Sequence, residues 1–163
     1  MKEHAHLDMS TQGNVIGLNQ LGRRLKNLVY LSAEHLYEWA LLAKSDELRA
    51  LLIKYHVDRS QLAMAIDEYL VDYETVPIAA NDDRYDTNYL ISNVPNQVSS
   101  GDSEVLAHIF QQEQKFASDV KRLANLLPEF PGDLLLNIGF SCCELKAELV
   151  YLQSKSKKVS SPE

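Results

Sequence analysis

The sequence predicts an all-α protein, a four-helix bundle made of two helical hairpins that a long crossover joins. Three observations lead to this fold class. Mostly apolar residues recur at alternating spacings of three and four in four segments, which is the pattern of a helix with one buried face. Only a few residues separate the first segment from the second, and the third from the fourth, so each pair is expected to be antiparallel. By contrast, residues 74–102 separate the second segment from the third.

The first segment runs from about Asn14, a good helix cap, to about Ala43. The second follows the break KSDE, where Ser45 can cap the helix and the acidic Asp46 and Glu47 suit the positive end of the helix dipole. The inward stripe of the first segment is Leu18, Leu21, Leu25, Leu28, Ser32, His35 and Trp39, and that of the second is Leu48, Leu52, Tyr55, Arg59, Leu62, Ile66 and Tyr69.

The third segment starts near Asp102, with Glu104 in its first turn, and the fourth starts after PEFP, where Pro131 can occupy the first helical position. Both segments keep the alternating spacing to their ends. The inward stripe of the third is Leu106, Ile109, Glu113, Phe116, Val120, Leu123 and Leu127, and that of the fourth is Leu135, Ile138, Cys142, Leu145, Leu149 and Leu152.

The segment 74–102 is acidic, lacks a helical period and contains Pro77 and Pro95. A connection of this length without structure of its own is uncommon in a compact domain. It is long enough to run the whole length of the bundle, which would leave the second and third helices parallel. The sequence therefore predicts a flexible N-terminal segment at 1–13, a single bundle domain at 14–153 with its crossover at 74–102, and a disordered tail at 154–163.

Composition excludes several classes of function. Hydrophobic residues make up 45% of the chain and charged residues 24%, which is typical of an ordinary globular protein. The net charge of −7 argues against duplex nucleic acid or an anionic membrane as partner, because both require a basic surface. No stretch approaches the ~20 apolar residues of a membrane span. The polar N-terminus does not resemble a signal peptide, and two adjacent cysteines make no disulfide framework, so a cytoplasmic location is expected.

Each stripe is interrupted near its middle by side chains that are not simple hydrophobes. Counted from the end where the first two helices turn, these residues fall within a band of roughly 8 Å at 1.5 Å per residue. The sequence thus predicts a polar layer across the centre of the bundle. Its members are Ser32, His35, Arg59, Glu113 and Cys142.

Three interpretations of this layer stay open. Arg59 and Glu113 can form a buried pair that fixes the helix register, with hydrogen bonds from His35 and from the Tyr55 hydroxyl. Alternatively the layer is a ligand or metal site. Finally, the residues assigned to the inward stripes can be displaced by one position, which would place Glu113 at the edge of the core.

The chain resembles the ferritin-like superfamily, and within it a small bacterial branch of stress-associated proteins of unknown function. The second segment, SDELRALLIKYHVDRSQLAMAIDEYL with Arg59 among apolar positions, resembles the second helix of that branch, and HIFQQEQKF with Glu113 resembles the third. The resemblance covers about residues 15–153 and is one of pattern and order. It implies a ferritin-like bundle.

The ligand pattern of the superfamily's di-iron enzymes is degenerate here. Those enzymes use a Glu on two helices and Glu-x-x-His on the other two. Glu113 and Glu34 can stand for the single glutamates, but the second helix has Asp58 followed by Gln61, and the fourth has Ser141 followed by Glu144. Arg59 also places a fixed positive charge where a metal would lie.

The favoured prediction is a non-catalytic structural or binding protein without a cofactor and with a stress-related role, as the resemblance implies. A second hypothesis is an iron- or manganese-dependent oxidase or storage protein that uses Glu34, His35, Glu113 and Glu144. A third is an adaptor that binds another protein through the crossover. Because Tyr30, Tyr37 and Trp39 cannot all face one interior, a homodimer through the first two helices is also expected.

Overall fold

A computed structural model describes the backbone of residues 2–73 and 101–159, and the side chains of residues 19–71 and 101–155. This part of the chain is all-helical and contains no strand, which confirms the predicted class. Its four helices are α1 (Lys2–Leu42), α2 (Asp46–Tyr73), α3 (Asp102–Asn125) and α4 (Gly132–Val159). The predicted crossover lies mostly outside the described residues.

The helix limits differ from the predicted ones at both ends of the chain. α1 begins at Lys2, well before Asn14, and α4 continues to Val159, beyond residue 153. The prediction placed the limits where the apolar stripe stops. A helix can continue past that point because its backbone hydrogen bonds are internal, and the added segments contain the good helix formers Ala5, Leu7 and Lys157. The limits predicted at Asp102 and after Pro131 agree with α3 and α4.

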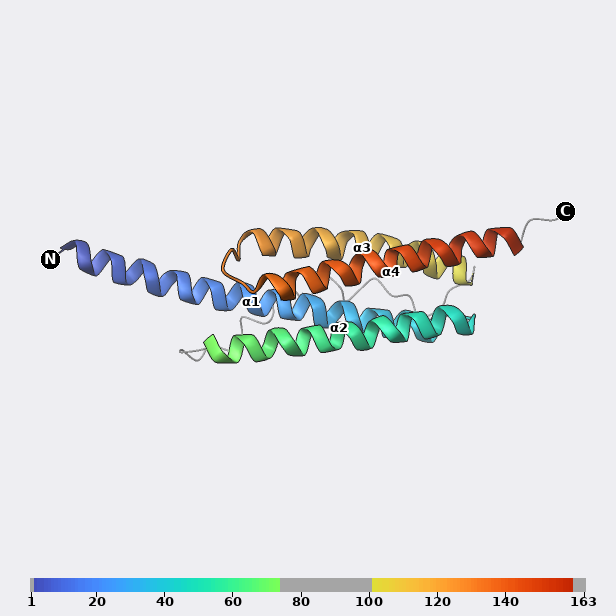
Figure 1. The fold of residues 1–163 in the computed structure, drawn as a ribbon, viewed down its shortest axis with the longest axis horizontal. Coiled ribbons are helices and arrows are strands. Elements are labelled where there is room, and N and C mark those ends of the chain that lie inside the picture. The colour runs from blue at the N-terminus through green and yellow to red at the C-terminus, as the bar shows by residue number, and fades with distance from the viewer. Residues whose placement is uncertain (1, 74–100, 160–163) are drawn as a thin grey trace.

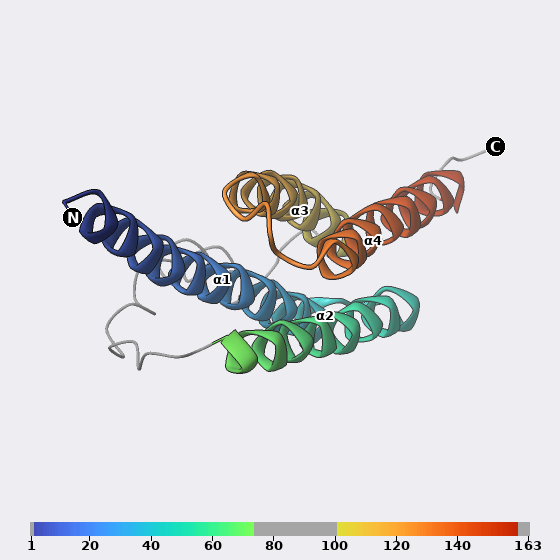
Figure 2. The same ribbon diagram turned by 60° about the vertical axis from the view of Figure 1, so that its left-hand side comes forward.

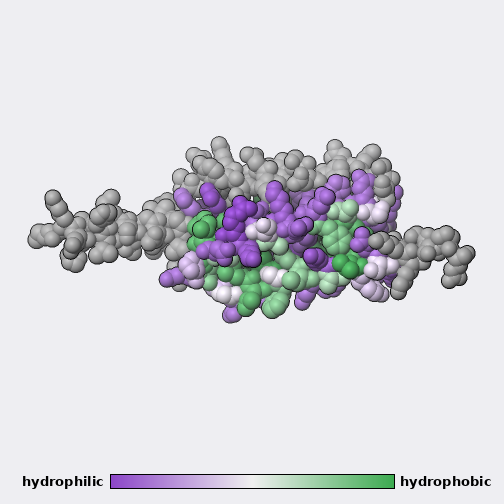
Figure 3. Space-filling view, turned by 90° about the horizontal axis from the view of Figure 1, so that it is seen from above, coloured by the Kyte–Doolittle hydropathy of each residue, from purple (hydrophilic) through white to green (hydrophobic). Residues whose placement is uncertain are grey.

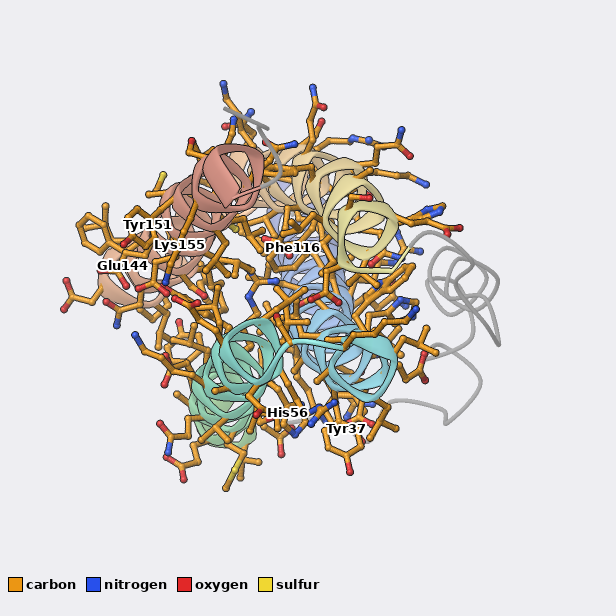
Figure 4. The ribbon with its side chains drawn as sticks, turned by 90° about the vertical axis from the view of Figure 1, so that its right-hand side faces the viewer. Tyr37, His56, Phe116, Glu144, Tyr151 and Lys155 are labelled. Carbon is orange, nitrogen blue, oxygen red and sulfur yellow. The ribbon has the colours of Figure 1, made fainter. Side chains whose placement is uncertain are left out.

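The four helices lie roughly along one axis (Figure 1), and α1 extends beyond the others at its N-terminal end. Figure 2 shows α1 beside α2, and α3 beside α4, with opposite directions within each pair. α1 also packs against α3, and α2 against α4, with the α1–α2 contact by far the most extensive. In the view along the bundle (Figure 4), the helices therefore occupy the corners of a quadrilateral.

Small residues bring α1 and α2 close together. Ala33 and Ala40 of α1 and Ala63 of α2 are buried. At Gly22 the approach is closer still, because an added Cβ would lie 2.5 Å from a Leu70 methyl group. Small side chains let the two backbones approach each other, which gives this pair its large contact.

The start of α3 is tied to the turn between α1 and α2. Ser45 caps α2 as predicted, since its hydroxyl accepts a hydrogen bond from the Leu48 N–H at 3.2 Å. The Asp102 carboxylate accepts hydrogen bonds from the N–H groups of Lys44 and Ser45 at 2.7 and 2.9 Å. Burial alone would raise the pKa of Asp102, but these hydrogen bonds outweigh burial and hold it below its ordinary value. α2 ends at Tyr73, so its end and the start of α3 lie at opposite ends of the bundle (Figure 1).

The hydrophobic core consists of two clusters. One is centred on Leu25, Ile66 and Phe116, and the other on Trp39, Leu52 and Leu145. Every helix contributes to both clusters, so each occupies one half of the bundle's length.

The exposed surfaces of α3 and α4 differ in polarity. Figure 3 shows the α3–α4 side, where hydrophilic residues cover α3 and hydrophobic residues gather along α4. The exposed hydrophobic side chains on α4 are Leu136, Phe140, Val150 and Tyr151.

Candidate functional site

The two core clusters are separated by a layer of buried polar side chains to which all four helices contribute. On each helix, these residues lie between the positions that join one cluster and the positions that join the other. We call this set the polar layer, and it consists of Ser32, His35, Arg59, Glu113 and Ser141.

A bidentate ion pair forms the centre of the polar layer. Arg59 is 1% exposed and Glu113 is 7% exposed. The two terminal nitrogens of Arg59 donate to Glu113 Oε1 and Oε2 at 2.6 and 2.5 Å. Burial alone would lower the pKa of Arg59, but the charge and hydrogen bonds of Glu113 outweigh burial and raise it. Arg59 therefore stays charged in the core.

The rest of the Arg59 guanidinium is also held in place. Its Nε donates to Ser141 Oγ on α4 at 3.2 Å, and its carbon lies 4.7 Å from the centre of the Phe116 ring. Figure 4 shows Phe116 between the four helices. Arg59 thus links three helices: its own α2, α3 through Glu113, and α4 through Ser141.

His35 belongs to a second network, between α1 and α3. Its Nδ1 lies 3.5 Å from the Gln112 side-chain nitrogen, while Trp39 Nε1 donates to the Gln112 side-chain oxygen at 2.8 Å. Trp39 in turn stacks on His108, with ring centres 5.2 Å apart. The predicted bond from His35 to Glu113 is not formed; the contact of His35 Nδ1 is with the Gln112 side chain instead.

Burial lowers the pKa of His35, although the charges of Glu38 and Glu34 act in the opposite direction. The unfolded chain takes up a proton near pH ~6.5, whereas the folded protein does so only at lower pH. Stability should therefore fall as pH falls through this range, because the unfolded state then binds more protons. Urea unfolding followed by Trp39 fluorescence is expected to show a smaller loss of stability on acidification in His35→Gln than in the wild type. Equal losses would contradict this.

Tyr55 and Cys142 do not join the hydrogen bonds of the polar layer. Tyr55 packs in the Trp39 cluster, and its hydroxyl has no hydrogen-bond partner. Cys142 packs against the other cluster, and burial raises the pKa of its thiol to about 12 even though Arg59 favours the thiolate. The thiol is thus protonated and unreactive at neutral pH. Its neighbour Ser141 occupies the place in the layer that was predicted for Cys142.

The four residues predicted for the metal-site alternative are not brought together. Glu113 is held by Arg59, and Glu144 lies on the outer side of α4 (Figure 4). Among the residues that the structure describes, no three His, Cys, Asp or Glu side chains are grouped so that they could hold a metal ion. The described residues thus do not group Glu34, His35, Glu113 and Glu144 into one site, because spacing along separate helices does not fix how those helices are rotated toward one another. Metal binding by these four residues stays a prediction.

Sequence reasoning missed Ser141 and Gln112. Both lie next to positions on the apolar stripes, and both are residue types that are mostly exposed in folded proteins. The available signal was the five N–H donors of the Arg59 guanidinium, because a single carboxylate cannot satisfy all of them in a buried site.

Comparison of the chain with protein-family models, with curated proteins and with solved structures gave no match. Among the described residues, no helix is both long and apolar enough to span a membrane.

Proposed function

We propose that the protein is a non-catalytic structural or binding protein, a ferritin-like bundle with an Arg59–Glu113 pair in place of a di-metal centre. The observation that carries this proposal is the buried bidentate pair, which puts a fixed positive charge where di-iron bundles gather their ligands. The helix order supports the topology, because α2 ends and α3 begins at opposite ends of the bundle. The stress-related role follows from the resemblance alone and stays a prediction.

Metal retention tests this proposal. Purified, untagged protein would be offered iron, manganese and zinc, desalted, and analysed for bound metal. We expect the wild type to retain no stoichiometric metal, because Arg59 already binds the Glu113 carboxylate that a metal would need. Near-stoichiometric iron or manganese that disappears in Glu113→Gln would contradict the proposal.

The predicted adaptor role would act through the crossover, which lies mostly outside the described residues. It stays a prediction, and loss of partner binding on deletion of residues 78–92 with unchanged helicity would test it.

We further propose the predicted homodimer, formed through the outer face of α1 and α2. Tyr37 lies against His56 with ring centres 5.2 Å apart, so the exposed stripes of the two helices meet (Figure 4). From Ile53 to Val71 the face is ~27 Å long at 1.5 Å per residue and ~20 Å wide. It thus covers roughly 500 Å² in projection. Because side chains protrude from the face, its accessible surface is larger than the projection and approaches the ~800 Å² that each partner buries in a stable interface. The exposed hydrophobic residues of this face are Tyr30, Tyr37, Leu41, Ile53, Val57, Met64 and Val71.

Sedimentation tests the homodimer. We expect twice the chain mass of 18.5 kDa at micromolar concentration, and a monomer for Met64→Glu, because a charge cannot be buried unpaired in an apolar interface. The matched control is Leu136→Glu, at an equally exposed position on α4, which should leave the dimer intact. A monomeric wild type, or dissociation by Leu136→Glu alone, would overturn this interface.

A further inference from the structure

A groove of about 410 Å³ lies between α1 and α3, close to the end of the bundle where α2 stops. The position of Gly22 shows this, because Gly22 contacts Leu70, which lies about one turn before the end of α2 at Tyr73. The floor of the groove is apolar and its outer edge is exposed, since Leu126 is 55% exposed. Its apolar lining residues are Leu21, Leu28, Leu123 and Leu126.

The groove is positively charged although the whole chain carries a net charge of −7. Arg24 of α1 and Lys115 and Arg122 of α3 line it. Among the described lining residues the single carboxylate is Asp119, which lies 2.7 Å from Arg122. Three cations and one carboxylate leave this lining with a net charge of +2. The groove therefore favours an acidic segment that also has apolar residues.

The connection from α2 to α3 has two routes around the bundle. These two helices occupy diagonal corners, so a chain that leaves α2 at Tyr73 and enters α3 at Asp102 passes over either α1 or α4 (Figure 4). On the α4 side, the described residues that line the hollow between α2 and α4 include Asp58 and Glu144 but no Lys or Arg. Because the connecting segment is acidic, its charge favours the route over α1 and the positive groove.

The first part of the connecting segment has the composition that the groove favours. Residues 76–78 are Val-Pro-Ile, and Asp82 and Asp83 follow them. In an extended chain, Ile78 and Asp82 are ~13 Å apart at 3.3 Å per residue. Leu126 and Lys115 are ~17 Å apart along the helix direction at 1.5 Å per residue. Apolar residues placed over the leucines near Leu126 would thus bring the two carboxylates to Lys115.

We propose that residues 76–83 bind in the α1–α3 groove, with their apolar residues on its leucines and with Asp82 and Asp83 beside Lys115. The rest of the connection is long enough, because residues 84–101 can span up to ~60 Å, whereas Lys115 lies ~20 Å along α3 from Asp102. This inference goes beyond the proposed function and depends neither on the absence of a metal centre nor on the homodimer.

Disulfide trapping in the full chain tests the proposal. In a Cys143→Ser background, Ile78→Cys would be combined either with Leu126→Cys in the groove or with Leu136→Cys on α4. These two positions are matched, because they are 55% and 58% exposed and lie where α3 ends and α4 begins. We expect an intrachain disulfide to form at least about tenfold faster with Leu126→Cys, since docking raises the local concentration of the two thiols. Equal or faster bridging with Leu136→Cys, or no bridging with either, would overturn the proposal.

A charge reversal tests the part assigned to the carboxylates. Lys115→Glu in the chain with Ile78→Cys and Leu126→Cys should slow bridging at least about twofold, as expected when exposed ion pairs are lost. The matched control is Lys146→Glu, at an exposed position on α4, which should leave the rate unchanged. An unchanged rate in Lys115→Glu, or equal slowing by Lys146→Glu, would overturn the pairing of Asp82 and Asp83 with Lys115.

Discussion

Replacing Glu113 by Gln is expected to lower the free energy of unfolding by roughly 3–5 kcal/mol, because it leaves the buried charge of Arg59 uncompensated. Arg59 is 1% exposed, so water cannot solvate the guanidinium in its place. The other groups near it, the Ser141 hydroxyl and the Phe116 ring, are neutral and cannot replace a carboxylate. Urea unfolding followed by Trp39 fluorescence and by circular dichroism would measure the change.

A double variant shows why Glu113→Gln destabilises the protein: because Arg59 is left as an unpaired buried charge, or because the Arg59–Glu113 pair itself stabilises the fold. In Arg59→Met/Glu113→Leu both charges are removed, and apolar side chains of similar length join the adjacent clusters. This variant should be more stable than Glu113→Gln, since replacing a whole buried pair is often neutral or stabilising. A Glu113→Gln change below about 0.5 kcal/mol, as for an ordinary surface substitution, would show that the pair is not buried as described.

The fold class could be predicted because the sequence pattern that indicates it lies within each single helix. Alternating spacings mark the inward face of each helix, and Leu25, Leu52, Ile109 and Leu145 are indeed buried. The sequence pattern said less about which residues form the outer faces of the helices. α4 exposes Phe140 and other apolar residues, so hydrophobicity on this helix does not separate core from surface (Figure 3).

The polar layer could be predicted only where chemistry allowed few partners. A buried Arg59 requires a carboxylate, and Glu113 is the single carboxylate on the inward stripes. The partner of His35 could not be predicted, because Gln112 comes close only through the rotation of α3 against α1. Whether the Tyr55 hydroxyl has a partner depends on atomic positions that no spacing specifies.

Phe116→Ala is the other substitution with a large expected effect, a loss of about 3–5 kcal/mol. The Phe116 ring is 2% exposed and belongs to the Leu25–Ile66 cluster. Its face also lies 4.7 Å from the Arg59 guanidinium, so truncation would open a cavity directly beside the buried ion pair. The loss of stability should thus combine the cost of the new cavity with the loss of the ring face that stabilises the Arg59 guanidinium.

Two further variants test this account of Phe116. Phe116→Leu refills much of the cavity but lacks the ring, so it should lose less stability than Phe116→Ala. The matched control is Phe140→Ala on α4, where the ring is 59% exposed and truncation should change the free energy of unfolding by no more than about 0.5 kcal/mol. If Phe116→Ala in the Arg59→Met/Glu113→Leu background costs as much as in the wild type, the ring contributes packing alone. A smaller cost there would show that part of its effect acts through Arg59, because double-mutant cycles isolate such coupling.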